Sequence, residues 1–435
     1  MENHVAEYGA PRGCPGAYRG DLCGEPWKEG IVGHHRVRLL DTSSEAALSA
    51  ELTRLDVAEE WAGHMARKGR VIPLRVEKVR GKAASVLKQH MLSAGGECAL
   101  GRQVADFDDT PAAVVLLGTR RHYTEIIRKL RAQPFGLAQI AEELAAVLDA
   151  MQRVPDPIRC GERQLHFSEK TLLMGIINTT PDSFSGDGLG NDVESAVEQA
   201  RQFVAAGVDI IDVGGQSTRP RSEEVPLAEE IKRVAEPVAI ISEECGVPVS
   251  IDTSRPEVAE SALAAGATFI NDVYALRRDG MAQVAAETGA GICLMHMQGE
   301  PRTMQSNPQY GDLISEVYGF LSERTEALVA GGVAETQIMI DPGFGFGKTV
   351  QHNLEIVRRL RELTSLGRPI LIGPSRKSTI GKVLGQKGPE ARLWGTAAVC
   401  ALSIANGAAM IRAHDVAEMA QTARMADAVL RGWEG

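Results

Sequence analysis

Three acidic or amide side chains stand where short apolar runs of the second half of the chain end. Asp252 and Asp341 each follow such a run, and Asn271 lies near the end of another. A flat heterocycle that offers a ring N–H beside an exocyclic amino group pairs bidentately with a carboxylate, and an amide adds another hydrogen-bonding group. These residues therefore indicate a site that recognises the hydrogen-bonding edge of a polar ring.

A second set of residues at such positions is cationic. Its members are Arg219, Lys377, Arg412 and His414. The chain as a whole is acidic, so an anionic ligand needs a local group of cations of this kind. Lys377 could also serve as a Schiff-base nucleophile, but its neighbours Arg376 and Ser378 favour binding of anions and carbonyl groups. The two sets together indicate a substrate that carries both a polar ring and a phosphate or diphosphate.

The elements that must position these residues alternate between apolar runs and amphipathic segments. Eight runs are each followed by a loop and a helical pattern, at 172–177, 208–213, 247–251, 268–272, 291–295, 338–340, 370–372 and 408–412. Strands that alternate with helices predict a parallel sheet, and eight such units predict an α/β protein with a closed (β/α)₈ TIM barrel. The site would lie at the carboxyl ends of the strands, with the phosphate pocket after strands seven and eight. An open doubly wound sheet is the alternative, but no G-x-G-x-x-G motif follows the first run.

The composition sets limits on partners and compartment. The 435 residues include 47 Lys and Arg against 57 Asp and Glu, a formal net charge of −10, so general binding to nucleic acid or to an anionic membrane is not expected. No apolar run reaches the roughly 18 residues of a transmembrane helix, and the first residues lack the apolar stretch of a signal peptide. Seven cysteines without a CxxC pair are typical of a reducing compartment, which predicts a cytoplasmic protein.

The chain is predicted to have three parts. These are a flexible tail over 1–40, a small α/β N-terminal domain of unknown role over 41–155, and the barrel over 165–435. Within the second part we expect a helix over 45–67 and a strand over 71–76. Pro73 places that strand at the edge of a sheet, because proline lacks a backbone N–H.

Two segments resemble other kinds of site, namely a phosphate-binding P-loop and a metal site. Residues 341–349 end in Gly-Lys-Thr, but Pro342 stands where a P-loop needs its first glycine, so the glycines are expected to let the backbone approach a ligand closely. His296 lies between Met295 and Met297, which would suit a soft metal, although a pocket wall is the favoured interpretation.

Several longer segments of the second half have a specific order and spacing. They read Met174-Gly-Ile-Ile-Asn-Thr-Thr-Pro-Asp-Ser-Phe-Ser185, Asp212-Val-Gly-Gly-Gln-Ser-Thr-Arg-Pro220, Ser250-Ile-Asp-Thr253, Asn271-Asp-Val273, Leu294-Met-His-Met-Gln-Gly299, Asp341-Pro-Gly-Phe-Gly-Phe-Gly-Lys348, Ser375-Arg-Lys-Ser378 and Arg412-Ala-His-Asp-Val416. Together they resemble the dihydropteroate synthase family of pterin-binding TIM barrels, from about Leu172 to the C-terminus. The chain departs from the family's usual pattern at Gln216, where a Glu is usual, and at Ser185-Gly-Asp-Gly188, where Ser-Asp-Gly is usual.

The resemblance implies a reaction and a role for each matching residue. It implies that 6-hydroxymethyl-7,8-dihydropterin diphosphate condenses with 4-aminobenzoate by an SN1-like route, with Mg²⁺ as cofactor. The pterin would be bound by Asp252, Asn271, Asp341 and Lys377. The diphosphate would meet Asn178, Arg412 and His414, with Asn178 also a ligand of Mg²⁺. Thr218 and Arg219 would lie on a mobile loop, and Phe346 and Ser378 would hold the aminobenzoate. The catalytic residues would be Asp252, Asp341, Lys377 and Arg412.

The family also implies a homodimer, here through the Ala-rich amphipathic segments 391–405 and 416–430. The alternative is a corrinoid/folate methyltransferase of the pterin-binding barrels, which would share the ring-reading Asp and Asn residues. Such an enzyme would not need the clusters at 375–378 and 412–414 to hold a diphosphate, so those clusters favour the synthase.

Overall fold

The structure is a computed structural model that describes residues 38–40, 44–105, 110–179, 193–216 and 225–433. The chain forms two compact units, Met1–Val71 and Ile72–Gly435. The division predicted from the sequence, into a tail (1–40), a small α/β domain (41–155) and a barrel (165–435), stays a prediction. The tail before residue 38 lies outside the described residues.

The described part of the first unit contains two helices where the sequence predicted one. They are α1 (Glu45–Thr53) and α2 (Glu59–Gly69). Ser44 caps α1, because its hydroxyl accepts a hydrogen bond from the N–H of Ala47 at 3.0 Å. The expectation of a continuous helix over 45–67 was wrong. Asp56 takes a left-handed backbone conformation (φ 63°), which a right-handed helix cannot contain.

The second unit opens with a small α/β layer. Its antiparallel sheet has the order β1-β3-β2, with β1 (Ile72–Val79), β2 (Glu97–Ala99) and β3 (Ala112–Gly118). Its helices are α3 (Gly81–Ala94), α4 (Arg102–Ala105), α5 (Arg120–Leu130) and α6 (Leu137–Ala150). The strand that carries Pro73 lies at an edge of this sheet, which confirms the prediction.

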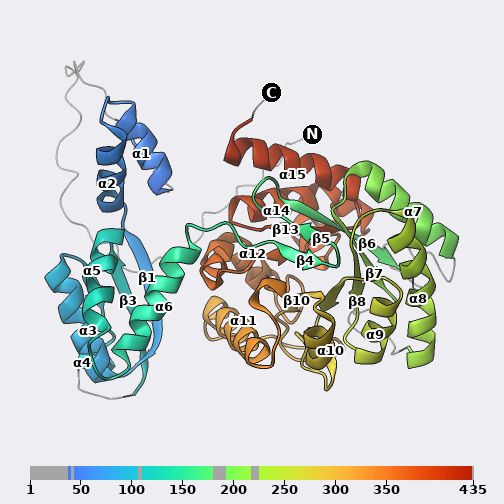
Figure 1. The fold of residues 1–435 in the computed structure, drawn as a ribbon, viewed down its shortest axis with the longest axis horizontal. Helices are drawn as coiled ribbons and strands as arrows, with labels where there is room; N and C mark the ends of the chain where they lie inside the picture. The colour runs from blue at the N-terminus through green and yellow to red at the C-terminus, as the bar shows by residue number, and fades with distance from the viewer. Residues whose placement is uncertain (1–37, 41–43, 106–109, 180–192, 217–224, 434–435) are drawn as a thin grey trace, which may run out of the picture. The chain divides into compact units, whose positions relative to one another are not determined.

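The rest of the chain forms the predicted barrel (Figure 1). Its strands are β6 (Leu172–Asn178), β7 (Ile210–Gly214), β8 (Val249–Asp252), β9 (Phe269–Asp272), β10 (Gly291–Met295), β11 (Ile338–Asp341), β12 (Leu371–Ile372) and β13 (Met410–Ala413). Its helices are α7 (Val193–Ala206), α8 (Leu227–Glu244), α9 (Pro256–Ala264), α10 (Met281–Thr288), α11 (Leu313–Ala330), α12 (Val350–Arg359), α13 (Ser378–Leu384), α14 (Leu393–Ala405) and α15 (Val416–Arg431). Short 3₁₀ turns lie at Glu335–Gln337, Leu360–Leu366 and Glu390–Arg392.

The eight strands form one sheet in the order β11-β10-β9-β8-β7-β6-β13-β12, and every pairing in it is parallel. The two end strands come together at a parallel bridge between Ile340 and Ile370. The N–H of Ile340 also donates to the carbonyl of Pro369 at 3.0 Å. These contacts close the sheet, which confirms the predicted TIM barrel and excludes the open doubly wound alternative.

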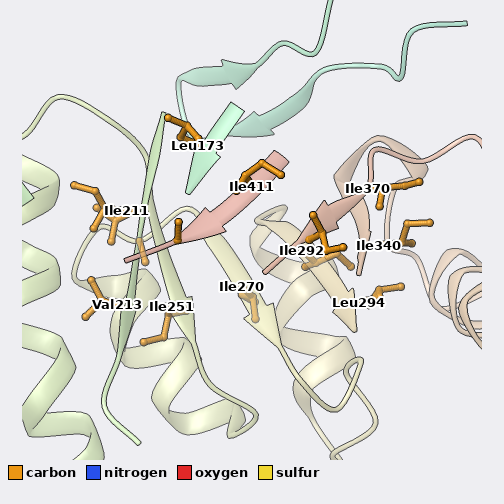
Figure 2. Packing of buried hydrophobic residues seen from close by; sticks show 14 of the residues in the cluster. Leu173, Ile211, Val213, Ile251, Ile270, Ile292, Leu294, Ile340, Ile370 and Ile411 are labelled. Carbon is orange, nitrogen blue, oxygen red and sulfur yellow. The ribbon is translucent and has the colours of Figure 1, made fainter. Parts of the chain in front are cut away.

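Side-chain alternation along the strands separates the packing surface from the interior. Residues such as Ile211, Ile270, Ile340 and Ile411 join one buried cluster with residues of the surrounding helices (Figure 2). The residues next to them on each strand point to the opposite face, because the side-chain period of a strand is two. On each strand, the residues directly before and after a helix-facing aliphatic residue therefore point into the barrel interior.

A hairpin precedes the first barrel strand and packs against the interior of the barrel. It consists of β4 (Ile158–Cys160) and β5 (Arg163–Leu165), which pair antiparallel. Ile158 is 1% exposed and shares a cluster with the first residues of several barrel strands, including Ile210 and Phe269. The hairpin therefore covers the amino end of the barrel, opposite the end where the polar residues lie.

Candidate active site

The inward-facing positions of the strands are apolar at the amino end and polar two residues later. The pairs are Ile210 and Asp212, Phe269 and Asn271, Met339 and Asp341, and Met410 and Arg412. Because alternate residues share a face, each pair places a polar side chain directly above the apolar floor. The predicted residues Asn271, Asp341 and Arg412 are brought together in this way, with Asp212 beside them.

Arg412 is the centre of a buried hydrogen-bond network. Its Nε donates to Oδ2 of Asp212 at 2.6 Å, and its Nη2 donates to Oδ2 of Asp252 at 2.7 Å. The Nδ2 of Asn271 donates to the same Oδ2 of Asp212 at 2.9 Å. Arg412, which the resemblance assigned to the diphosphate, therefore also binds Asp252, which was expected to bind the ring, and Asp212, which was not.

Burial and these contacts set the ionisation of the network. Burial raises the pKa of Asp252 to about 7, although the guanidinium of Arg412 opposes the shift. Burial also raises the pKa of Asp341, with Lys377 opposing it. For Arg412, burial alone would lower the pKa, but the carboxylates of Asp212 and Asp252 outweigh it and raise the pKa. The guanidinium thus stays charged.

Two carboxylate oxygens at this site have no hydrogen-bond partner among the described residues. They are Oδ1 of Asp212 and Oδ1 of Asp252, and both are buried. Buried polar atoms in proteins are almost always paired. An unpaired acceptor on Asp252, at the carboxyl end of β8, is therefore a position where a ligand N–H can bind.

Lys377 borders the other side of the mouth. Its Nζ donates to the carbonyl oxygen of Phe344 and lies 4.3 Å from the centre of the Phe346 ring, in cation–π geometry. Burial lowers its pKa to about 7, although the carboxylate of Asp341 opposes the shift. Ser378 follows directly as the exposed first residue of α13.

The segments after β12 and β13 are joined by polar contacts between two pairs of residues. The hydroxyl of Ser375 accepts from the backbone N–H of His414 at 3.1 Å and lies 3.0 Å from its Nδ1. Since Ser375 accepts one bond, its own proton can go to Nδ1, which favours a proton on Nε2 of His414. Arg376 forms a bidentate pair with Asp415 at 2.6 and 3.0 Å and is therefore structural here.

The expected Mg²⁺ ligand, Asn178, is the last residue of β6 and is half-buried. In the part of the chain that the structure describes, no group of three or more His, Cys, Asp or Glu could hold a metal ion. One amide oxygen fits an ion such as Mg²⁺, which often takes one or two protein oxygens and completes its shell with water and substrate phosphates. Thr218 and Arg219 lie outside the described residues.

Two buried residues of the site were not singled out by the sequence reasoning. Asp212 was noted only as a strand end, yet it is fully buried and holds both Asn271 and Arg412. Lys348 was noted only within a glycine-rich segment, yet it is 2% exposed and hydrogen-bonded to His296. A signal existed for Asp212, because it is a charged residue within an apolar run, where burial needs a partner. Lys348 lies between Gly347 and Thr349, so no such signal exists for it in the sequence.

Comparison with known proteins shows the family of the chain. A family described as "Pterin binding enzyme" matches residues 174–414, which is more than half of the chain. The chain therefore belongs to the pterin binding enzymes.

Individual relatives and solved structures show which kind of pterin binding enzyme the chain resembles. A dihydropteroate synthase from Synechocystis is 47% identical over 278 residues, which cover 64% of this chain and 96% of that protein. A probable bifunctional folylpolyglutamate synthase/dihydropteroate synthase from Haloferax volcanii is 37% identical over 372 residues, covering 83% of this chain and 43% of that protein. A structure of Xanthomonas albilineans dihydropteroate synthase with 4-aminobenzoic acid matches with a TM-score of 0.59 and 39% identity, over 63% of this chain and 98% of that one. Within its family the chain is a dihydropteroate synthase, a transferase of folate biosynthesis. The assignment excludes the corrinoid/folate methyltransferase that the sequence had left as the alternative.

Proposed function

We propose that this chain condenses 6-hydroxymethyl-7,8-dihydropterin diphosphate with 4-aminobenzoate to give 7,8-dihydropteroate and diphosphate. The arylamine nitrogen forms a bond to the pterin methylene carbon and loses a proton. The C–O bond to the diphosphate breaks, and its electron pair leaves with the diphosphate. The observation that carries the proposal is the shared barrel mouth, where the buried carboxylates of Asp252 and Asp341 meet the cations of Lys377 and Arg412.

The acceptors at the mouth suit the pterin ring. Asp252 offers a buried unpaired oxygen, and Asn271 uses its amide N–H₂ on Asp212, which leaves its carbonyl oxygen as an acceptor. Asp341 offers a second carboxylate, of which Oδ1 accepts from the N–H of Gly343 at 2.7 Å. A pterin presents ring N–H and exocyclic amino donors to such a set. These three residues, with Lys377, are the proposed pterin site.

The charge distribution suits an SN1-like departure of the diphosphate. As the C–O bond breaks, positive charge develops on the methylene carbon, and the carboxylates of Asp252 and Asp341 would stabilise it. Negative charge develops on the diphosphate, and Arg412, His414 and Asn178 would bind it, together with Arg219 beyond the described residues. Groups already oriented toward developing charge are commonly the largest contribution to catalysis.

Mg²⁺ is the proposed cofactor, with Asn178 as its protein ligand. When bound, the ion supplies positive charge to the diphosphate oxygens. The chain itself contributes the amide oxygen at the end of β6 and the nearby donors at the ends of β12 and β13. A titration of activity with Mg²⁺ in wild type and Asn178→Ala tests this part, since the variant is expected to need more metal.

The arylamine is proposed to lie against Phe346, Lys377 and Ser378. The amine of 4-aminobenzoate is neutral at pH 7, so no strong general base is needed. Its carboxylate carries the negative charge, and the N–H and O–H of Ser378 at the start of α13 are donors beside the ammonium of Lys377.

The function is tested by two measurements on one preparation. Calorimetry with the pterin diphosphate should show binding without turnover, and addition of 4-aminobenzoate should then release diphosphate. Asp252→Ala and Lys377→Ala are expected to lower kcat/KM about 100-fold, as loss of a buried charged partner commonly does. Normal kcat/KM in either variant would contradict its assignment, and no diphosphate release by wild type would contradict the function.

A homodimer is proposed through α14 and α15, which pack against each other. Both helices leave large apolar side chains at the surface, namely Trp394, Leu402, Met425 and Val429. Contiguous exposed apolar groups are typical of protein interfaces. Sedimentation of wild type and Leu402→Glu tests this proposal, since the variant should shift toward monomer.

A cytoplasmic location is proposed from the cysteines. Those in the described residues, Cys98, Cys160, Cys245, Cys293 and Cys400, are free and buried. No helix in that part of the chain is long and apolar enough to cross a membrane.

A further inference from the structure

The segment between β11 and α12, residues 342–349, follows a path that only glycine allows at three positions. We call it the glycine loop. Gly343, Gly345 and Gly347 all have left-handed backbones, with φ of 71°, 85° and 59°. A Cβ on Gly343 would lie 1.9 Å from the carbonyl oxygen of His296, and one on Gly347 would lie 2.5 Å from that of Gln298. The glycine loop therefore lies directly on the chain that leaves β10.

The other side of the glycine loop contacts the proposed substrate site. A Cβ on Gly345 would lie 2.7 Å from Cδ of Lys377. The Nζ of Lys377 donates to the carbonyl of Phe344 and lies over the ring of Phe346. The position of the loop backbone thus sets the position of both the Phe346 ring and the Lys377 ammonium.

The buried side chain of Lys348 connects the glycine loop to His296 by hydrogen bonds. Its side chain is 2% exposed, and its Nζ contacts three acceptors: Nδ1 of His296 at 2.9 Å, the carbonyl of His296 at 3.3 Å, and the carbonyl of Phe346 at 3.0 Å. The ammonium form has three N–H donors, so these contacts use all of them. Burial lowers the pKa of Lys348 to about 7, although the carboxylate of Asp341 opposes the shift. None of the three acceptors is a carboxylate. The three hydrogen bonds of Lys348 therefore connect the glycine loop to the residue after β10, and Lys348 forms no ion pair through them.

His296 is the matching acceptor. It is 6% exposed, and its backbone N–H donates to the carbonyl of Asp341 at 2.9 Å. Burial lowers the pKa of His296 to about 2, so the ring is neutral and Nδ1 has a lone pair for Lys348. The Phe320 ring packs edge-on against it at 5.1 Å, which holds the imidazole in place.

We propose that Lys348 is a positioning residue for the second substrate: clamped by His296, it holds the glycine loop so that Phe346 and Lys377 form one wall for the arylamine. The inference rests on the proposed function and adds to it a residue that touches neither substrate. Loss of the clamp should affect the arylamine more than the pterin. Asp252 and Asn271 of the pterin site belong to other strands, and only Asp341 and Lys377 of that site contact the glycine loop.

The test is a comparison of Michaelis constants in Lys348→Met, which keeps most of the side-chain stem and removes the donors. We expect KM for 4-aminobenzoate to rise about tenfold, the loss typical of a buried hydrogen bond that orients a group. The affinity for the pterin diphosphate, from calorimetry, should change less than about threefold. Lys382→Met, the same change at an exposed lysine of α13, is the matched control and should behave as wild type. Equal losses for both substrates, or no loss, would overturn the proposal.

The pairing with His296 gives a second, independent test. His296→Leu leaves the buried ammonium one acceptor short, which costs more than removing both partners together. The double variant Lys348→Met/His296→Leu should therefore have a higher melting temperature than His296→Leu alone, and the same raised KM for 4-aminobenzoate as Lys348→Met. Additive losses would show that the two residues act separately and would overturn the clamp.

Gly347→Ala keeps the proposal testable if Lys348→Met does not fold. It displaces the loop by a clash with Gln298 while Lys348 remains, and should raise KM for the same substrate. A normal KM there would contradict the dependence on loop position. Wild-type release of diphosphate, measured first, distinguishes failure of this inference from failure of the proposed function.

Discussion

Asp252 and Lys377 titrate in the same range although they carry opposite charges. Burial raises the pKa of the Asp252 carboxyl and lowers that of the Lys377 ammonium, each to about 7. Asp252 accepts from donors best when it is ionised, which is above that value. Lys377 carries its positive charge below it. The two requirements overlap only near neutral pH.

We therefore expect kcat/KM for the pterin diphosphate to fall on both sides of neutral pH, with apparent pKa values that belong to the coupled network. Lys377→Arg should move the alkaline limb to higher pH, because arginine stays protonated throughout. Asp252→Asn should remove the acid limb, at lower overall activity. An alkaline limb that stays in place in Lys377→Arg would assign it to another group, and an acid limb that persists in Asp252→Asn would assign it to the substrate.

Asp212 is expected to matter without contacting substrate. Its one paired oxygen accepts from both Arg412 and Asn271, so it orients a cation and an amide at once. Asp212→Asn keeps the volume but removes the charge, and we expect kcat/KM for the pterin diphosphate to fall about 10- to 100-fold. KM for 4-aminobenzoate should stay near normal, the reverse of the pattern expected for Lys348→Met.

Ser250→Ala is the control for Asp212→Asn. Ser250 pairs with Asp212 in the strand register and is equally buried, but its hydroxyl has no hydrogen-bond partner among the described residues. Its removal should leave the kinetics unchanged. Similar losses in both variants would mean that any change in this layer disturbs the barrel, and would contradict a specific role for Asp212.

The hairpin of β4 and β5 is expected to contribute stability and not catalysis. Ile158 is buried against the amino ends of the barrel strands, whereas the site lies at the carboxyl ends. Ile158→Ala should lower the free energy of unfolding by about 2–5 kcal/mol, the usual cost of such a truncation in a core. Arg159→Ala, at the exposed neighbouring position, should cost little. Chemical denaturation measures both, and a changed KM in Ile158→Ala would contradict the separation of the two ends.

The barrel and the polar strand ends could be predicted from the sequence because each strand encodes them locally. An apolar run sets the strand, and the period of two fixes that Asp341 and Arg412 face inward above Met339 and Met410. The hairpin was missed because two strands of three residues each carry too little pattern to be recognised. Their burial is decided by the barrel, which lies later in the chain.

The partners of the site residues could not be predicted, for a different reason. Sequence placed Arg412 near an anion, but its bonds to Asp212 and Asp252 depend on how three strands distant in sequence are staggered in the closed sheet. Likewise the glycines of 341–349 indicated close backbone approach, but not that the approach is to the carbonyls after β10. Local pattern fixes which face a residue occupies, and the register between strands fixes what it touches.

The region before the barrel has a counterpart in at least one relative. The match to the Haloferax volcanii protein covers 83% of this chain, so it extends well beyond the barrel toward the N-terminus. The Synechocystis relative, by contrast, is almost wholly covered by 278 aligned residues, about the length of the barrel. The described residues of the proposed site also come only from the barrel. We therefore expect that the region before it is not required to build the site.

A chain that begins at Asp156 is accordingly expected to keep the transferase activity, with kcat/KM within about threefold of the full chain. A chain that begins at Arg163 differs by only seven residues, but it lacks β4 and with it the buried side chains of Ile158 and Cys160. Loss of these two should make it less stable by several kcal/mol, about the cost of two core truncations. Diphosphate release and urea unfolding of the two chains, side by side, measure both effects. If the chain from Asp156 is folded but inactive, the N-terminal region contributes to the site; if the two chains are equally stable, the hairpin does not support the barrel.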